Sequence, residues 1–284
     1  MALPDPSSDT TVVVTGASSG IGEALARELA RRGHHLTLTA RRASRLEELA
    51  GELTAHHGVD VTVVPADLSR ERSRSTLLRK VRSGDRAVVG LCNVAGNGAL
   101  GKILDHDLAD EQLVFDVNAA ALFQLTNVLV RDMVERGTGA VLNTGSILAF
   151  APIPQNATYA ATKAFVASFS EALHEELSGT GVSCTTLSPG PTRTPIFDRS
   201  GAEGAAGLGP GVFWQDAEDV AKPAVDGMVA GKRTVVPGLT NKLAVLGLSL
   251  TPRTALLPVT NLAQGESVRN FLLGSNGDGE DDGE

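Results

Sequence analysis

The sequence predicts one α/β domain, a doubly wound parallel sheet of about seven strands with helices on both faces. Short β-branched runs alternate with longer segments of helical period, which is the pattern of βαβ units. The runs are apolar on both sides, so helices must cover both faces of the sheet. A chain of 284 residues, 42% of them hydrophobic, is long enough for one large core but too short for two.

The first run, TVVVT at 11–15, is β-branched throughout and predicts the first strand. The next segment has Ala24, Leu25 and Leu29 on one side and ends at Gly33, as an amphipathic helix does. Further apolar runs predict strands at 35–40, 59–67, 86–96, 139–146, 181–190 and 233–238. Segments of helical period predict helices at 22–33, 44–58, 110–137 and 159–179. Right-handed crossovers turn this order into a doubly wound sheet.

The two ends of the chain differ from its body in composition. Residues 1–10 hold Pro and Ser and predict a flexible arm, whereas residues 11–274 form the domain. Residues 275–284 are Gly-rich and acidic, which predicts a disordered tail. The tail supplies five of the negative charges behind the net −8, so the body carries about −3. No basic face or stripe is visible, and we expect no nucleic-acid partner.

Two segments near the carboxyl end break the alternation of strands and helices. Residues 197–215 contain five glycines and no periodicity, and they follow the sixth strand at the edge where open α/β sheets bind ligands. We interpret about 190–215 as a substrate lid rather than as plain disorder. The extension at about 238–274 is apolar and interrupted by Pro; it can pack on the domain, line a substrate pocket or form an oligomer contact.

Cys92 and Cys184 lie in apolar strand-like runs and are expected to be buried free thiols, without a disulfide or a metal site. Such cysteine usage favours a reducing cytoplasm. The start of the chain lacks the basic and apolar regions of a signal peptide, and the stretch LAVLGLSL is too short for a transmembrane segment, so we expect none. The two pairs of adjacent histidines would point in different directions on any regular element, so we expect no metal.

A glycine-rich turn follows the first strand directly. The sequence TGASSGIG places Gly16, Gly20 and Gly22 where the strand gives way to a helix. Glycines let the backbone approach a pyrophosphate, and a helix N-terminus offers free N–H groups and a partial positive charge. The spacing differs from the common G-x-G-x-x-G, but its place between strand and helix predicts a dinucleotide site rather than a mere tight turn.

The end of the second strand bears on which dinucleotide is bound. An NAD site usually has an acidic side chain there, which binds the hydroxyls of the adenosine ribose. This strand ends in TARR, where Ala40, Arg41 and Arg42 offer no carboxylate but two guanidinium groups. Guanidinium groups pair well with a 2′-phosphate, so the sequence favours NADP(H) over NAD(H), with Arg41 as the contact. Alternatively, both arginines begin the next helix as solvated charges.

Tyr159 is the only tyrosine of the chain, and Lys163 stands four positions after it. On a helix, residues four apart share a face, with their Cβ atoms roughly 5–6 Å apart. An ammonium at that range favours the phenolate, which would bring the pKa of Tyr159 nearer neutral and make the phenol a usable proton donor or acceptor. Taken alone, the pair is also compatible with a half-buried aromatic beside a solvated lysine.

Together with these features, a series of motifs resembles the short-chain dehydrogenase/reductase family, classical subgroup, over roughly residues 10–237. In chain order the motifs are TGASSGIG, ADLS with Asp67, NVAG at 93–96, Asn118, Ser146, YAATK at 159–163 and PGPTRT at 189–194. The family often has a second Asn where Val94 stands, near the sheet core, a change that we expect to affect stability more than chemistry. The resemblance implies a Rossmann-type sheet and a nicotinamide cofactor.

The resemblance also implies a catalytic set. Tyr159 would be the general acid/base, and Lys163 would lower its pKa and hold the nicotinamide ribose. Ser146 would hydrogen-bond the substrate carbonyl oxygen and stabilise charge as it develops. Asn118 would position a water that links Lys163 to solvent, and Thr192 would contact the nicotinamide carboxamide.

The glycine turn and the resemblance together give a set of expected cofactor contacts that spans the whole domain. Its members are Gly16, Ser18, Ser19, Gly20, Ile21, Gly22, Arg41, Asp67, Leu68, Asn93, Ala95, Gly96, Tyr159, Lys163, Pro189, Gly190 and Thr192.

These observations favour an NADP(H)-dependent oxidoreductase that reduces a carbonyl to an alcohol, or the reverse. The aromatic residues in the expected lid favour a small to medium, apolar substrate. The motifs do not separate 3-oxoacyl thioester, steroid-like ketone and sugar substrates, nor do they fix the direction of the reaction. The alternative is a catalytically silent NADP(H)-binding sensor or partner protein. The resemblance implies a homodimer or homotetramer, for which the apolar helix at 157–179 is the expected interface.

Overall fold

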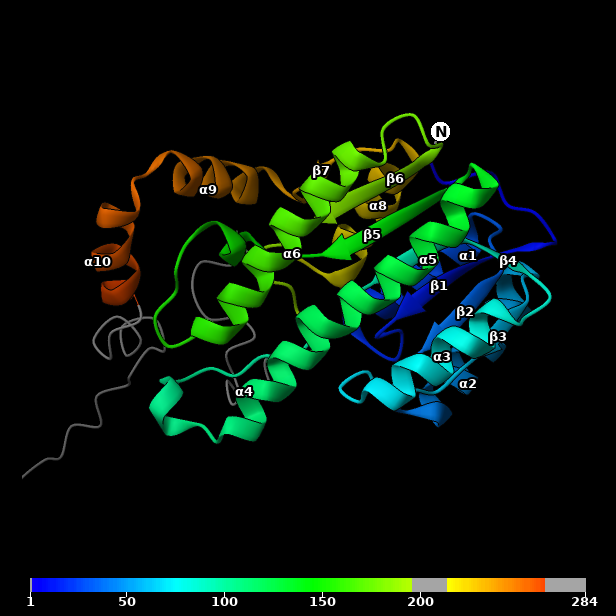
Figure 1. Cartoon of the computed structure of the whole chain (residues 1–284), viewed down its shortest axis with the longest axis horizontal. Coiled ribbons are helices and arrows are strands. Elements are labelled where there is room, and N and C mark those ends of the chain that lie inside the picture. The colour runs from blue at the N-terminus through cyan, green and yellow to red at the C-terminus, as the bar shows by residue number, and fades with distance from the viewer. Residues whose placement is uncertain (1, 196–213, 264–284) are drawn as a thin grey trace, which may run out of the picture.

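The computed structural model describes residues 2–195 and 214–263 (Figure 1). Most of the expected lid and the acidic tail lie outside these residues. Seven parallel strands form one sheet in the order β3-β2-β1-β4-β5-β6-β7. They are β1 (Thr10–Thr15), β2 (Leu36–Thr39), β3 (Val61–Val63), β4 (Ala87–Asn93), β5 (Gly139–Thr144), β6 (Val182–Leu187) and β7 (Thr234–Val235). The predicted doubly wound fold is confirmed, and the order of the strands reverses between β1 and β4.

Helices cover both faces of the sheet because the side chains of each strand alternate. In β1, Val12 and Val14 face one core cluster and Val13 faces the other. The first cluster is covered by α1 (Gly20–Arg31), α2 (Ala43–His57) and α8 (Ala217–Val229). The second is covered by α3 (Glu71–Arg82), α5 (Leu122–Arg136) and α6 (Ala157–Glu176). Cys92 lies in the first cluster and Cys184 in the second, both as buried free thiols.

The helix expected at 110–137 is longer and is interrupted. It consists of α4 (Leu108–Phe115), a π-helical turn η2 (Asp116–Ala121) and α5. By length and composition alone, Leu108–Arg136 could cross a membrane. Half of its most apolar window is buried, and the α5 side chains Leu125, Leu129 and Met133 lie in the core. Its hydropathy is therefore that of a core helix.

The amino-terminal segment differs from the flexible arm expected at residues 1–10. Leu3 is buried in the first core cluster, and the backbone N–H of Ala2 donates to the carbonyl of Val229, at the end of α8. Gly90 leaves the space on β4 into which Leu3 and Val12 pack. A buried leucine and a backbone hydrogen bond fix residues 2 and 3 on the domain, which the Pro and Ser content did not reveal.

The carboxyl-terminal extension forms α9 (Leu239–Leu250) and α10 (Arg253–Ala263), beyond the carboxyl ends of the strands (Figure 1). Leu248 of α9 and Leu256 of α10 pack in a small apolar cluster with Ile153 and Ala160. The extension therefore packs on the domain. It does so beside the segment that leads from β5 through the 3-10 turn η3 (Ile147–Phe150) to α6.

Candidate active site

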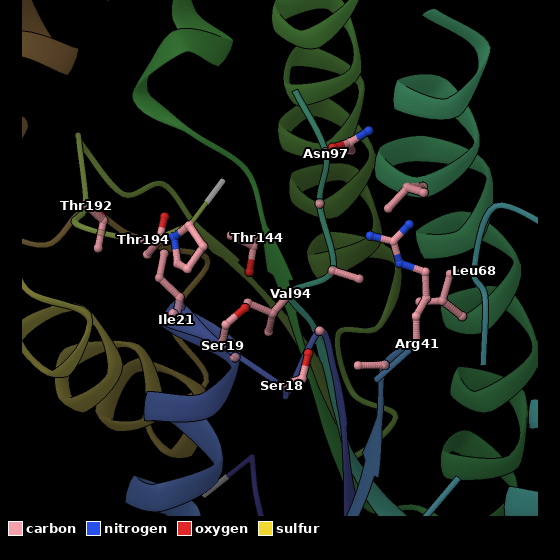
Figure 2. A pocket seen from close by; sticks show the side chains of 18 of the residues that line it. Ser18, Ser19, Ile21, Arg41, Leu68, Val94, Asn97, Thr144, Thr192 and Thr194 are labelled. Atoms are coloured by element: carbon pink, nitrogen blue, oxygen red, sulfur yellow. The ribbon is translucent and has the colours of Figure 1, made fainter. Parts of the chain in front are cut away.

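A cavity of about 340 Å³ opens at the carboxyl ends of the strands, where the strand order reverses between β1 and β4. It is elongated, with Arg41 and Leu68 at one end, Thr192 and Thr194 at the other, and Ser19 below (Figure 2). Most of the predicted site residues line it. They are Gly16, Ser18, Ser19, Gly20, Ile21, Gly22, Arg41, Asp67, Leu68, Ala95, Gly96, Ser146, Tyr159, Lys163, Pro189, Gly190 and Thr192. Only Asn93 and Asn118 of the predicted set do not.

The glycines of the β1–α1 turn are required by close backbone packing. Gly16 has a φ of +66°, and a Cβ there would lie 2.9 Å from Ala95 Cα. Gly20 has a φ of +58°, and a Cβ would lie 2.8 Å from the Thr194 side chain. A Cβ on Gly22 would overlap the carbonyl of Gly16. Side chains are thus excluded at these three positions of the turn, where the backbone needs glycine.

The N-terminus of α1 is free to hold an anion. Its N-cap residue, Ser19, makes no side-chain cap hydrogen bond, so the first N–H groups of the helix are not satisfied by a cap. Uncapped N–H groups and the helix dipole favour a phosphate at this place. Together with the glycine turn and an elongated cavity, this arrangement fits the pyrophosphate of a dinucleotide.

Arg41 and Arg42 stand at the end of β2, on the cavity wall. The Arg42 guanidinium donates to the carbonyl oxygen of Ser18, at 2.9 Å, and to its hydroxyl, at 3.1 Å. Arg42 therefore ties the glycine turn to β2, which the sequence did not indicate. Near Arg41, burial raises the pKa of Asp67, but hydrogen bonds from Ser69 and the charges of nearby arginines outweigh burial and hold that pKa below its ordinary value. No carboxylate follows β2 directly, so Arg41 and Arg42 place two cations at this end of the cavity, beside the carboxylate of Asp67.

Asn93 does not line the cavity but is buried in the core beneath it, and its expected contact with the cofactor stays a prediction. Its side chain donates to the hydroxyl of Thr126 and to the amide oxygen of Asn143, each at 2.9 Å. Asn143 in turn donates to the Ser170 hydroxyl. This buried network joins β4, β5, α5 and α6, because an asparagine in the middle of a covered sheet must satisfy its amide internally.

Tyr159 lines the cavity in the first turn of α6 and shares a hydrogen bond with Ser146. Burial raises the pKa of Tyr159, and the hydrogen bond with Ser146 opposes this rise only in part. The lowered pKa expected from Lys163 is therefore not seen. Ser146 also accepts a hydrogen bond from the backbone N–H of Leu148, which holds its hydroxyl at the end of β5.

Lys163 is buried beside Tyr159, with Nζ 5.5 Å from the centre of the phenol ring. Its ammonium donates to the carbonyl oxygen of Thr144 at 2.8 Å. Burial lowers the pKa of Lys163 to about 8, which weakens the lysine as a source of positive charge for the phenol. Lysine and tyrosine share one helix face, as predicted, but both are pushed towards their neutral forms.

Asn118 lies in the π-helical turn and is buried at the side of the cavity. Its amide oxygen accepts from the backbone N–H of Asn97 at 2.8 Å, and its amide nitrogen donates to the Asn97 carbonyl at 2.9 Å. The same nitrogen donates to the Thr162 hydroxyl at 3.2 Å. Asn118 thus links the loop after β4 to the helix that carries Tyr159 and Lys163. A π-turn in a helix often marks a functional site.

The segment after β6 closes the far end of the cavity. The backbone N–H of Ile147 donates to the carbonyl of Pro189, so the exits of β5 and β6 are tied together. Thr192 pairs with Gln215 in an isolated parallel bridge, and the Arg193 guanidinium lies 3.0 Å from a carboxylate oxygen of Asp216. These contacts join the described ends of the expected lid, whose residues 196–213 lie outside the described part of the chain.

Several lining residues were not predicted. They are Ala40, Arg42, Ala66, Val94, Asn97, Leu113, Val117, Thr144, Gly145, Thr194 and Pro195. Of these, Asn97 follows NVAG immediately and Thr194 ends PGPTRT, so both could have been predicted from their positions beside or within a motif. Val94 packs against the first core cluster, as expected, and also lines the cavity (Figure 2).

The sequence model for short chain dehydrogenases matches residues 10–204 of this chain. With the seven-stranded parallel sheet and the cavity at its switch point, the match identifies an oxidoreductase, and the chain belongs to the short-chain dehydrogenase/reductase family.

The chain is similar to several named members of this family. Sulfoacetaldehyde reductase 2 of Chromohalobacter salexigens is 36% identical over 219 residues, which cover 74% of this chain and 85% of that protein. A short-chain dehydrogenase from Sphingobium yanoikuyae, solved in complex with NADPH, is 33% identical, with a TM-score of 0.77 over 88% of this chain and 95% of that chain. The bulky-bulky ketone specific alcohol dehydrogenase from Comamonas testosteroni is 29% identical, with a TM-score of 0.71 over 87% and 96% of the two chains.

The lowered pKa of Lys163 predicts a pH-dependent stability difference. Below pH 8 the folded and the unfolded chain both hold the proton, and the full penalty of burying the ammonium is present. As the pH rises from about 8 towards 10.5, only the unfolded chain keeps the proton, and the penalty disappears. Relative to Lys163→Met, the wild type should therefore gain unfolding free energy on the order of 3 kcal/mol across this range. Urea unfolding of both proteins at several pH values measures the difference, and a difference that stays constant with pH contradicts the prediction.

Proposed function

We propose that the chain is an NADP(H)-dependent oxidoreductase that reduces a carbonyl group to an alcohol, or catalyses the reverse reaction. One observation carries the proposal: Tyr159, Ser146 and Lys163 meet in the same cavity as the glycine turn and the two arginines at the end of β2. A hydride donor held along this cavity would have a proton donor and a hydrogen-bond donor at one end and phosphate-binding groups along its length.

In this proposal, Tyr159 is the general acid in reduction and the general base in oxidation. When bound, the nicotinamide supplies or accepts the hydride. Ser146 donates a hydrogen bond to the carbonyl oxygen and stabilises the negative charge that develops there. Tyr159 then gives its proton to that oxygen. The raised pKa of Tyr159 suits this step, because it keeps the phenol protonated until the oxygen becomes basic.

Lys163 and Asn118 would support the proton transfer by positioning Ser146 and Tyr159. The Lys163 ammonium holds the end of β5 through Thr144, two residues before Ser146, and so helps to set the distance between Ser146 and Tyr159. Asn118 fixes the turn of α6 through Thr162, whose hydroxyl also donates to the Tyr159 carbonyl at 2.8 Å. Because the Asn118 side chain is engaged in this way, we propose a positioning role for it in place of the water-binding role expected from the resemblance.

NADP(H) is proposed over NAD(H) on two grounds. Arg41 and Arg42 line the cavity where an NAD site would have a carboxylate. The similar Sphingobium yanoikuyae dehydrogenase was solved with NADPH.

The substrate is proposed to be small to medium and apolar, because Leu148, Ile153 and Leu256 form an apolar cluster next to Ser146 and α6.

A homo-oligomer in the cytoplasm is proposed for the working protein. On α5 and α6, the ring centres of Phe123 and Phe165 each lie 5.7 Å from that of Phe169. Phe123 is 46% exposed and Phe165 41% exposed, and exposed aromatic side chains that cluster are typical of interfaces. Cys92 and Cys184 as buried free thiols favour a reducing compartment.

Replacing Tyr159 by Phe tests the proposed chemistry. The variant should lose roughly 10²–10⁴-fold in turnover of its best substrate in a panel of ketones, aldehydes and 3-oxoacyl thioesters, because general acid catalysis contributes about that much. NADPH binding, followed by fluorescence, should change little and serves as the control for folding. Wild type that binds NADPH but turns over nothing would favour a catalytically silent sensor. A variant as active as the wild type would contradict the role of Tyr159.

Replacing Arg41 by Ala tests the cofactor preference. Loss of a charge-assisted contact to the 2′-phosphate should raise the Kd for NADPH roughly ten- to hundred-fold and leave the Kd for NADH nearly unchanged. Arg70→Ala is the matched control, because Arg70 pairs with Asp67, at 3.3 Å, but does not line the cavity. Equal losses in the two variants, or tighter binding of NADH than NADPH by the wild type, would contradict the preference.

Sedimentation equilibrium tests the proposed oligomer. The wild type should have the mass of two or four chains at micromolar concentration, and Phe165→Asp should shift it towards the mass of one chain by placing a charge in the interface. Leu104→Asp is the control, because Leu104 is 91% exposed and lies away from α5 and α6 in the chain. A wild type with the mass of one chain would overturn this part of the proposal.

A further inference from the structure

Asn241 lies in the first turn of α9 and is fully buried, although α9 belongs to the extension beyond the sheet. Its amide nitrogen donates to the side-chain oxygen of Gln215 at 2.9 Å and to the carbonyl of Pro237 at 3.0 Å. Its amide oxygen has no hydrogen-bond partner among the described residues. A buried polar side chain with an unpaired acceptor lowers the stability of the fold. We therefore ask which contacts of the amide explain an asparagine at this position.

One of these contacts is Gly190, on the cavity wall. A Cβ on Gly190 would lie 2.5 Å from Asn241 Cγ and would overlap both polar atoms of the amide. Gly190 is not among the glycines with a positive φ, so its backbone conformation is open to other residues. The Asn241 amide is therefore what excludes a side chain at this position.

The second contact, Gln215, pairs with the segment that follows Gly190. The backbone N–H of Gln215 donates to the carbonyl of Pro191, and the N–H of Arg193 donates to the carbonyl of Gln215, each at 3.0 Å. Gln215 also forms the bridge with Thr192. Residues 191–193 and Gln215 thus form a short hydrogen-bonded ladder. Asn241 packs against Gly190, next to one side of this ladder, and donates a hydrogen bond to Gln215 on the other side.

We propose that Asn241 is a positioning residue for the nicotinamide half of the cofactor. It fixes the segment from Pro189 to Thr192 and makes α9 part of the cofactor site. The inference rests on the proposed function, because that segment lies at the end of the cavity remote from Arg41 (Figure 2). The adenosine half, held near Arg41 and Leu68, does not depend on Asn241.

The test compares two ligands on Asn241→Ala. NADP⁺ reaches both ends of the cavity, whereas adenosine 2′,5′-bisphosphate carries the adenosine and the 2′-phosphate but no nicotinamide. Loss of the amide should weaken NADP⁺ binding roughly ten-fold and leave binding of the bisphosphate unchanged, as measured by calorimetry. Leu248→Ala is the matched control on the same helix, because Leu248 packs against the apolar cluster of Ile153. It should alter neither affinity.

A double variant tests the contact itself. Gly190→Ala alone should weaken NADP⁺ binding, because the new Cβ displaces the amide or the ladder. In the double variant Gly190→Ala/Asn241→Ala the overlap is gone. The added Gly190→Ala change should therefore not weaken NADP⁺ binding further than Asn241→Ala does alone. Strictly additive losses would overturn the proposal. Asn241→Ser, a smaller polar replacement, gives a second route if the alanine variant folds poorly.

The outcomes separate this inference from the function on which it rests. If the wild type binds both ligands and Asn241→Ala loses affinity for both equally, or for neither, the positioning role is overturned. The proposed function is then left intact. Wild type that binds neither ligand overturns the proposed function, and the inference falls with it. Selective loss of NADP⁺ affinity in Asn241→Ala, with unchanged bisphosphate affinity, supports the inference.

Discussion

The close approach of the β1–α1 turn to the chain that leaves β4 is the constraint on which the rest of the structure depends. Gly16 has no Cβ, and Ala95 occupies the space that one would need. The Thr15 hydroxyl accepts the backbone N–H groups of Val94 and Ala95, at 2.9 and 3.0 Å, and so fixes the two strand exits side by side. This contact lies where the strand order reverses, and the cavity opens directly above it. A Cβ at position 16 would meet the backbone of Ala95, so one of the two strand exits would have to shift.

Burial controls the chemistry at the other end of the cavity. It raises the pKa of Tyr159 and lowers that of Lys163, so the phenol stays neutral and the ammonium loses its proton above about pH 8. A neutral phenol is a proton donor, which agrees with the proposed reduction. The helix spacing that brings the two residues together says nothing about this balance, because the balance depends on how much water the surrounding elements exclude. The hydrogen bond with Ser146 lowers the pKa of Tyr159 and so opposes the effect of burial.

The strands and the cavity-lining motifs could be predicted because they depend on local sequence. Apolar β-branched runs gave all seven strands, and the glycine turn, YAATK and PGPTRT all line the cavity. Helix α3 was missed because ERSRSTLLRKVR is mostly polar, with only a narrow apolar stripe. The roles of Arg42 and Asn241 depend on tertiary contacts across the sheet edge, which no motif encodes. The buried hydrogen-bond network of Asn93 was not foreseen for the same reason, since a motif asparagine next to the cavity can form hydrogen bonds in the core beneath it.

The central claim is that one dinucleotide spans this cavity, with its phosphates on the glycine turn and its nicotinamide beside Tyr159. A crystal structure of the chain with NADPH tests it most directly. The account predicts the pyrophosphate at the N-terminus of α1, the 2′-phosphate against Arg41, and the nicotinamide between Tyr159 and the segment from Pro189 to Thr192. NADPH bound elsewhere, or bound here with its nicotinamide turned away from Tyr159, would contradict the account.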